Sequence, residues 1–310
     1  MNFRSFIIFF LSLSLITCQD NKKAQSTSAV EDIASETLNT SHKEAFKPTT
    51  EFKAYWYAGE AEITSYKLEQ ARYGEIRQGE AVLVYVTEDV LPEIQVKADN
   101  YKKTNIPVLK LNATKQFNTG IYPYSIMQST FYPVTNNQHA FKVSCSVQEW
   151  CGHIYMQLNN RDQFEINSHS YFESEADQSF NVEKAILENE LWTQLRIDPN
   201  SLPVGELEII PSFEFLRLKH VPLKAYKATV KLESGQYLIS YPELDRTLKI
   251  TFNPEFPFDI LEWEDTYKSG FGPISKVLTT KATKLKTMKS AYWNKNETAH
   301  ESLRDSLLLN

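Results

Sequence analysis

From residue 52 onward, apolar and polar residues alternate mostly with a period of two, in short runs separated by turn residues. A period of two places successive side chains on opposite faces of a strand. The predicted strands cover residues 61–73, 81–86, 106–112, 141–147, 152–158, 164–171, 207–218, 224–232, 236–241 and 246–253, and part of 274–287. Strands at roughly 8–12-residue spacing favour a mainly β fold. We expect an antiparallel curved sheet that forms an open or half barrel.

One segment departs from this alternation. Residues 181–197 place apolar side chains close to one face of a helix, namely Val182, Ala185, Ile186, Trp192 and Leu195. Asn181 is a suitable N-cap, and Asp198-Pro199 ends the pattern. We therefore expect one amphipathic helix within a β-rich domain of residues 51–290. We expect this helix either to pack against the sheet or to plug it, as a link between two sheet-forming halves, and residues 291–310 to form a C-terminal tail.

The N-terminus has the features of a secretory signal peptide over residues 1–17. Arg4 precedes an apolar run over residues 6–16, which is shorter than the ~20 residues that span a bilayer. The run ends at Leu15-Ile16-Thr17-Cys18, which is similar to the lipobox of bacterial lipoproteins. That similarity implies that Cys18 is acylated, with chains such as palmitate, and becomes the new N-terminus. The alternative is an ordinary signal peptide with a chance cysteine.

Residues 18–50 are rich in Ser, Thr, Glu and Lys and have no aromatic residue before Phe46. This composition predicts a flexible tether between a membrane and the folded domain. The expected location is the cell envelope, most simply the outer membrane, and the sequence does not select its periplasmic or its surface face. The net charge of −6 disfavours a nucleic-acid partner.

Cys145 and Cys151 remain as a pair in an oxidising compartment. Their short spacing is suited to a disulfide that closes a hairpin loop, and the alternative is two free cysteines. A zinc site would need more ligands than His153, which is the only histidine near them. The chain has no glycine-rich phosphate loop, no dinucleotide-binding turn, no nucleophile elbow and no His-Glu-x-x-His motif. We therefore predict no cofactor and no metal.

Two groups of carboxylates lie beside aromatic residues. Glu173 and Glu175 follow Tyr171, and Glu262 and Glu264 flank Trp263. Two carboxylates on opposite sides of a cleft are the catalytic groups of glycoside hydrolases. The alternative is a solvated charged edge or turn. Calcium also prefers carboxylate oxygens, but no calcium-loop motif supports it here.

Dense patches of aromatic residues are the other candidate for a functional site. They suit the wall of an apolar or sugar-stacking pocket, and the alternative is that they form the core of a β protein. The candidate ligand-binding residues are Tyr55, Trp56, Tyr122, Tyr124, Trp150 and Tyr171.

Four stretches, residues 55–66, 119–127, 147–153 and 269–272, resemble a family of uncharacterised cell-envelope lipoproteins of Bacteroidota-type bacteria. Members often carry the label "septum formation inhibitor Maf". That name belongs to cytoplasmic α/β nucleotide pyrophosphatases that open with a Ser-x-Ser-x-Arg-Arg type motif, which this chain lacks. The label therefore assigns no functional residue. In strand layout the chain also looks like envelope proteins of the lipoprotein-carrier type, which hold acyl chains in a half barrel.

Three functions follow as hypotheses. The first is a non-enzymatic, membrane-anchored envelope lipoprotein whose curved sheet binds an apolar or glycan ligand, including lipid, or an envelope partner protein. The second is an envelope glycan hydrolase that uses paired carboxylates. The third is a structural or assembly subunit.

Overall fold

The computed structural model describes residues 44–309, most of which form one 16-stranded sheet. The strands of the N-terminal part are β1 (Ala61–Arg72), β2 (Glu75–Leu91), β3 (Val96–Lys97), β4 (Ile106–Thr119), β5 (Tyr122–Pro133), β6 (Lys142–Glu149), β7 (Gly152–Asn160), β8 (Phe164–Ser170) and β9 (Gln178–Val182). The C-terminal part has β10 (Ile186–Leu187), β11 (Gly205–Ile210), β12 (Tyr226–Glu233), β13 (Gln236–Tyr241), β14 (Arg246–Phe252), β15 (Ile260–Ser269) and β16 (Lys276–Ser290). The α-helices are α1 (Thr50–Trp56), α2 (Glu188–Ile197), α3 (Phe213–Lys219) and α4 (Leu303–Ser306).

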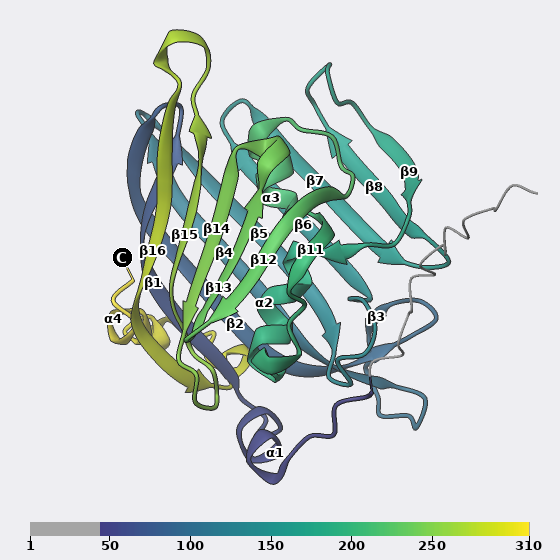
Figure 1. Cartoon of the computed structure of the whole chain (residues 1–310). Helices are drawn as coiled ribbons and strands as arrows, with labels where there is room; N and C mark the ends of the chain where they lie inside the picture. The colour runs from purple at the N-terminus through teal and green to yellow at the C-terminus, as the bar shows by residue number, and fades with distance from the viewer. Residues whose placement is uncertain (1–43, 310) are drawn as a thin grey trace, which may run out of the picture. The chain divides into compact units, whose positions relative to one another are not determined.

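Neighbouring strands of the sheet are antiparallel except for β10 and β11, which pair in parallel. The two parts of the chain meet where β1 pairs with β16, so the sheet is continuous. β9 and β10 lie at its two ends, and the sheet is not closed into a barrel. The sheet curves so that α2 and α3 lie between strands β4–β6 on one side and strands β12–β14 on the other (Figure 1). The predicted mainly β, open curved sheet is therefore confirmed.

The alternation in the sequence gives each strand one buried face. Along β14 every second residue, from Arg246 to Phe252, is buried. The turn between β1 and β2 consists of Tyr73 and Gly74, whose φ angles are 55° and 76°. Two left-handed residues match the twist of a tight hairpin, and glycine accepts this conformation without steric cost. The turn therefore fixes the register from Arg72 to Glu75.

The helix predicted over residues 181–197 begins later, at Glu188. The preceding residues are extended because the sheet needs them: Asn181 pairs with Glu165 in β8, and Ile186 pairs with Ile209 in β11. The side chain of Glu190 accepts a hydrogen bond from the backbone N–H of Leu187 (3.2 Å) at the start of α2. The part of the prediction that places 181–187 in the helix is therefore wrong, because strand pairing overrides local periodicity.

The strand predicted over residues 207–218 is also shorter than expected. β11 ends at Ile210, and Ser212 then caps α3 by accepting a hydrogen bond from the N–H of Phe215 (3.4 Å). Proline at 211 cannot continue a ladder, and Ser212 is a favoured N-cap residue. The strands β5 and β15 and the shorter strands β3, β9 and β10 were not predicted as strands.

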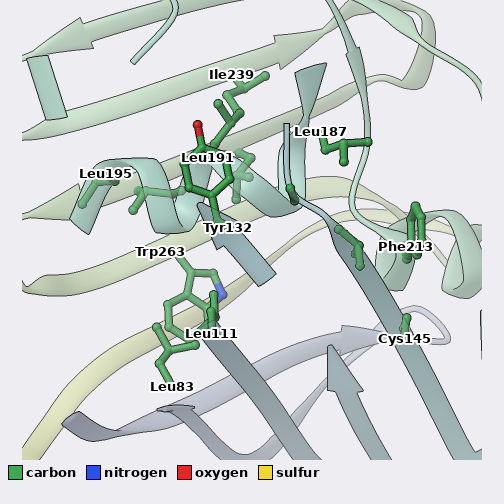
Figure 2. Packing of buried hydrophobic residues seen from close by; sticks show 14 of the residues in the cluster. Leu83, Leu111, Tyr132, Cys145, Leu187, Leu191, Leu195, Phe213, Ile239 and Trp263 are labelled. Atoms are coloured by element: carbon green, nitrogen blue, oxygen red, sulfur yellow. The ribbon is translucent and has the colours of Figure 1, made fainter. Parts of the chain in front are cut away.

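The core lies between the concave side of the sheet and the two inner helices (Figure 2). Leu191 and Leu195 of α2 are almost completely buried, and so are Tyr132 of β5 and Ile239 of β13. Each such side chain contributes about 1.5–3 kcal/mol through burial. α2 is thus the element that fills the space between the two parts of the sheet.

Both ends of the described chain pack against the sheet. The N–H of Phe46 donates to the carbonyl of Thr135 (2.7 Å), and the Phe46 ring lies 5.3 Å from that of Phe52. The predicted tether therefore ends before Phe46 rather than at residue 50. In the tail, the carbonyl of Leu307 accepts a hydrogen bond from Ser65 (2.5 Å). The signal peptide, Cys18 and residues 18–43 lie outside the described residues. Within residues 44–309, no helix has the length and apolarity needed to cross a bilayer.

Candidate functional site

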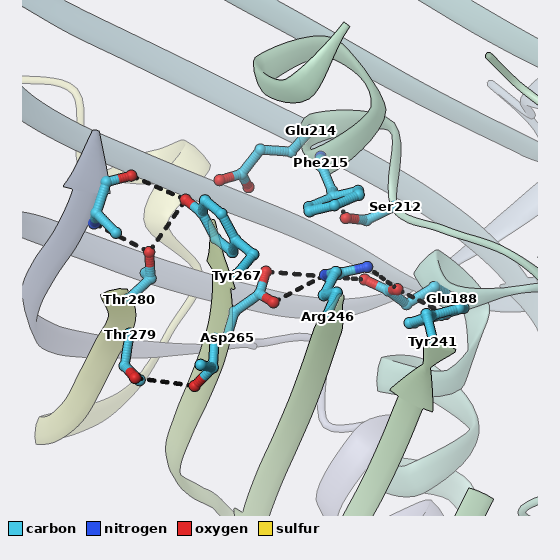
Figure 3. Close-up of polar contacts among 12 residues, drawn as sticks. Glu188, Ser212, Glu214, Phe215, Tyr241, Arg246, Asp265, Tyr267, Thr279 and Thr280 are labelled. Carbon is cyan, nitrogen blue, oxygen red and sulfur yellow. Dashed lines mark hydrogen bonds and ion pairs between the residues drawn. The ribbon is translucent and has the colours of Figure 1, made fainter. Parts of the chain in front are cut away.

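A buried cluster of charges joins α2 to the sheet. The guanidinium of Arg246 donates to both oxygens of Glu188 at 2.6 and 2.8 Å and to both oxygens of Asp265 at 2.8 and 3.0 Å (Figure 3). Tyr241 donates a further hydrogen bond to Glu188 (2.8 Å). Burial alone would raise the pKa of Glu188, but Arg246 outweighs it and holds that pKa below its usual range. Burial raises the pKa of Asp265 in spite of the same arginine.

A second polar cluster holds α3 in place. Glu214 accepts from Lys115 of β4 (2.7 Å) and from Gln128 of β5 (3.1 Å). Asn189 of α2 accepts from the backbone N–H of Phe213 (3.2 Å) and donates to Gln128 (2.9 Å). Hydrogen bonds therefore fasten both inner helices to β5, and α3 also to β4.

These two clusters line a cavity of ≈ 60 Å³ beneath α3. A water molecule needs about 10–15 Å³ on this measure, and an engineered cavity that admits benzene has about 150 Å³. The cavity thus has room for a few water molecules. Its main charged groups are paired with one another, as buried charges in a structural network are. The cavity is therefore part of a structural charge network.

A larger pocket of ≈ 180 Å³ opens where the strands end, and we call it the mouth pocket. The β1–β2, β6–β7 and β8–β9 connections and the end of α3 meet there. The residues that matter for its chemistry are Arg72, Tyr73, Tyr124, Phe172, Arg217 and His220.

Arg72 lies in the wall of the mouth pocket. Its guanidinium donates to the carbonyl of Leu218 (2.8 Å) and to the hydroxyls of Tyr73 and Tyr124 (3.1 Å each). It also lies over the two tyrosine rings, at 4.2 and 5.2 Å from their centroids. The two hydroxyls are 2.8 Å apart. These contacts give the pocket one wall that is both aromatic and cationic.

Three further titratable groups, Arg217, Glu175 and His220, lie beside the pocket. Arg217 of α3 forms an ion pair with Glu175, which belongs to the β8–β9 connection. Glu175 also contacts Nδ1 of His220 (2.7 Å). Burial and the neighbouring charges of Arg217, Arg72 and Lys219 hold the pKa of His220 below its usual range. His220 is therefore mainly neutral at pH 7, and arginines supply the positive charge of the pocket.

Of the six predicted ligand-binding aromatics, Tyr124 lines the mouth pocket, and Tyr122, Trp150 and Tyr171 lie near it without lining it. Tyr124 is buried in its wall. The ring of Tyr122 lies 6.0 Å from that of Tyr124 and 6.5 Å from that of Trp150. Trp150 and Tyr171 are exposed on adjacent turns, and the Tyr171 ring lies 6.5 Å from that of Phe172.

The other two predicted aromatics, Tyr55 and Trp56, lie at the opposite end of β1, in α1. Trp56 is fully buried and packs against Tyr85 and Arg196, so it belongs to the core. The hydroxyl of Tyr55 donates to Glu62 (2.5 Å). The structure therefore separates these two residues from the mouth pocket.

The predicted carboxylates do not face one another across a cleft. Trp263 and Asp265 of β15 point into the cavity, so the alternate residues Glu262 and Glu264 lie on the outer face. There Glu262 pairs with Lys281 (2.8 Å), and Glu264 contacts Lys249 and Lys281. Glu173 is exposed, whereas Glu175 lies at the mouth pocket. This arrangement matches the alternative of a solvated charged surface.

The predicted disulfide is contradicted, because both cysteines are free. Cys145 is buried in β6 opposite Met156, and Cys151 is exposed in the turn after that strand. At about 3.3 Å per residue along an extended strand, their Cα atoms are much farther apart than the ~7 Å limit for a disulfide. Within residues 44–309, no three His, Cys, Asp or Glu side chains gather as ligands for a metal ion.

Arg72, Tyr73 and Arg217 of the mouth pocket are not among the residues predicted from the sequence. One signal was available for Arg217, which is a lone cation in the apolar run Phe213-Glu-Phe-Leu-Arg-Leu218. A charge in such a run marks a buried polar contact. Arg72 and Tyr73 sit beside a turn glycine and gave no comparable signal.

No protein-family model and no curated protein sequence matches the chain. Two solved structures show a distant likeness. A β-barrel-like protein of the domain of unknown function DUF1849 from Brucella abortus has a TM-score of 0.42 and 5% identity, covering 74% of this chain and 96% of that one. A porin-like protein from Bacteroides uniformis has a TM-score of 0.21 and 9% identity, covering 72% and 95%.

Proposed function

We propose that this protein is a lipid-anchored binding protein of the cell envelope, held at the outer membrane by an acylated Cys18. Its mouth pocket binds a small ligand that stacks on aromatic rings, either a glycan or a compound with an apolar part. The lipobox-like sequence before Cys18 and the resemblance to envelope lipoproteins support the location. The aromatic mouth pocket supports the binding role.

The observation that carries the binding role is the convergence of Tyr73, Tyr124 and Phe172 at one opening. They come from three separate parts of the sheet, and Tyr122 and Trp150 continue the same aromatic surface outward. Tyr and Trp combine an apolar face with a polar edge, and such side chains line ligand sites. The enclosed inner cavity is smaller, and its main charges are paired internally.

Binding is tested on the chain produced without residues 1–18, purified from a bacterial envelope and measured by native mass spectrometry. We expect an added mass that disappears on denaturation. Tyr122→Ala combined with Trp150→Ala should remove it. Tyr155→Ala, on the exposed side of β7, is the matched control and should retain it. A bare mass, together with no response to glycan or amphiphile probes, would refute the binding role.

The anchor is tested separately with the full chain. We expect labelled palmitate to be incorporated and the protein to fractionate with outer membranes. Cys18→Ser should abolish the label and release the protein from the membrane fraction. Unchanged membrane fractionation of Cys18→Ser without any incorporated label would refute acylation as the anchor.

A further inference from the structure

Arg72, one of the two arginines of the mouth pocket, forms no ion pair with a carboxylate of the described residues. Arg72 is only 9% exposed, yet within residues 44–309 no carboxylate lies within ion-pair distance of it. Its partners are two tyrosine hydroxyls and one backbone carbonyl, all of which are neutral. A buried charge without a counterion is costly and marks a place where a ligand can supply one.

Arg217 adds a second guanidinium to the same pocket. It is 7% exposed, and its counterion Glu175 comes from a connection between strands rather than from the rigid sheet. Glu149, which lines the pocket, accepts a hydrogen bond from the backbone N–H of Cys151 (2.8 Å) within its own turn. Among residues 44–309, Glu175 is therefore the one carboxylate in ion-pair contact with either of these arginines.

Both arginines also keep an unused donor. The Nε atoms of Arg72 and Arg217 are buried and have no hydrogen-bond partner in the described part of the chain. An unpaired buried donor destabilises the protein unless an acceptor reaches it. Oxyanions are suited to this role because guanidinium groups bind them with paired, charge-assisted hydrogen bonds.

We infer that the mouth pocket recognises an oxyanion, that is, a carboxylate, sulfate or phosphate group, on the ligand that stacks on its aromatic rings. Arg72 and Arg217 hold the anionic group, and Tyr73 and Tyr124 orient Arg72. Glu175 occupies part of this position when no ligand is bound, and the ligand anion competes with it for Arg217. This inference rests on the proposed function and deepens it.

The test is titration calorimetry on the chain without residues 1–18, with phenyl phosphate as the anionic probe and benzyl alcohol as its neutral counterpart. Phenyl phosphate should bind at least about tenfold more tightly than benzyl alcohol. Arg72→Gln and Arg217→Lys should each remove most of this preference. Arg77→Gln is the matched control, because Arg77 pairs with Glu75 outside the mouth pocket.

Two further arms identify the source of the oxyanion. The affinity for inorganic phosphate reports how well the anion binds without an aromatic ring. Binding to vesicles of phosphatidylglycerol, compared with vesicles of phosphatidylcholine, reports recognition of an anionic lipid headgroup. Binding of either phenyl phosphate or phosphatidylglycerol that depends on Arg72 supports the inference. Because Arg72→Gln removes a buried side chain, its thermal unfolding is recorded, and Tyr124→Phe serves as a milder variant that should also weaken the preference.

These experiments distinguish the loss of the oxyanion site from the loss of the proposed binding function. Equal binding of phenyl phosphate and benzyl alcohol, unchanged by Arg72→Gln, would overturn the oxyanion site and leave a neutral aromatic site in place. Absence of binding by every probe, with a bare native mass, would overturn both.

Discussion

Arg196 and Glu62 form a bidentate ion pair in which the two guanidinium nitrogens contact the two carboxylate oxygens at 2.6 and 2.7 Å. The two side chains are 2% and 1% exposed. Arg196 belongs to α2 and Glu62 to β1, so the pair joins the inner helix to the strand where the two parts of the sheet meet. The pair therefore ties α2 to the junction between the N-terminal and C-terminal parts of the sheet.

Breaking this pair should destabilise the fold strongly. Arg196→Met leaves Glu62 as an uncompensated buried charge, and we expect a loss of about 3–5 kcal/mol in the free energy of unfolding. The double variant Glu62→Met, Arg196→Met should recover part of this loss because it buries no charge. Urea denaturation measures both. Lys67→Met, which breaks an exposed pair with Glu69, is the control and should change stability by at most about 0.5 kcal/mol. A single variant as stable as this control would contradict the role of the pair.

The dependence of stability on pH should carry opposite contributions from Glu188 and Asp265. The folded-state pKa of Glu188 is lowered by Arg246, so its stabilisation is present above its unfolded pKa and is lost as pH falls through the folded value. The folded-state pKa of Asp265 is raised by burial, so its contribution is most favourable at low pH and is lost as pH rises through the folded value. Glu188→Gln should therefore reduce the acid-side loss of stability, and Asp265→Asn should steepen it. Urea unfolding between pH 3 and pH 7 measures this pH dependence, because the pKa of a free carboxyl is about 4. Shifts of the same sign in both variants would contradict the prediction.

The two cysteines should differ in reactivity. In the chain without residues 1–18, the exposed Cys151 should react with a thiol reagent in the native protein, and the buried Cys145 should react only after unfolding. Burial also raises the pKa of the Cys145 thiol, which further slows its reaction. Counting modified thiols by mass before and after denaturation checks this. If neither thiol reacts without a reductant, the two are bridged, and the separation of the cysteines described above is incorrect.

Removing the charge of Glu175 should strengthen binding at the mouth pocket. Glu175→Gln frees Arg217 from its internal counterion, so we expect the affinity for phenyl phosphate to rise by roughly threefold to tenfold. Affinity for benzyl alcohol should stay the same. Glu173→Gln, an exposed neighbour on the same connection, is the matched control. Weaker phenyl phosphate binding in Glu175→Gln would mean that Glu175 supports the ligand rather than competing with it.

The sequence by itself determined that the chain forms an antiparallel sheet, because a period of two is a local property of each strand. β13 lies where the pattern places it, at Gln236–Tyr241. The pattern failed at residues 181–187, where apolar spacing favoured a helix but pairing with β8 and β11 required extended backbone. Local propensity is a weak preference that such contacts override.

Only the tertiary structure decided which residues form the site. Glu264 and Asp265 are adjacent in the sequence, yet Asp265 points into the cavity and Glu264 out to Lys249, and which face is inward depends on what the sheet encloses. Tyr124 and Trp150 were visible as candidates from their type, but Arg72 and Arg217 were not. They lie 145 positions apart and share a pocket only because the sheet curves around α3 and brings the ends of β1 and α3 together.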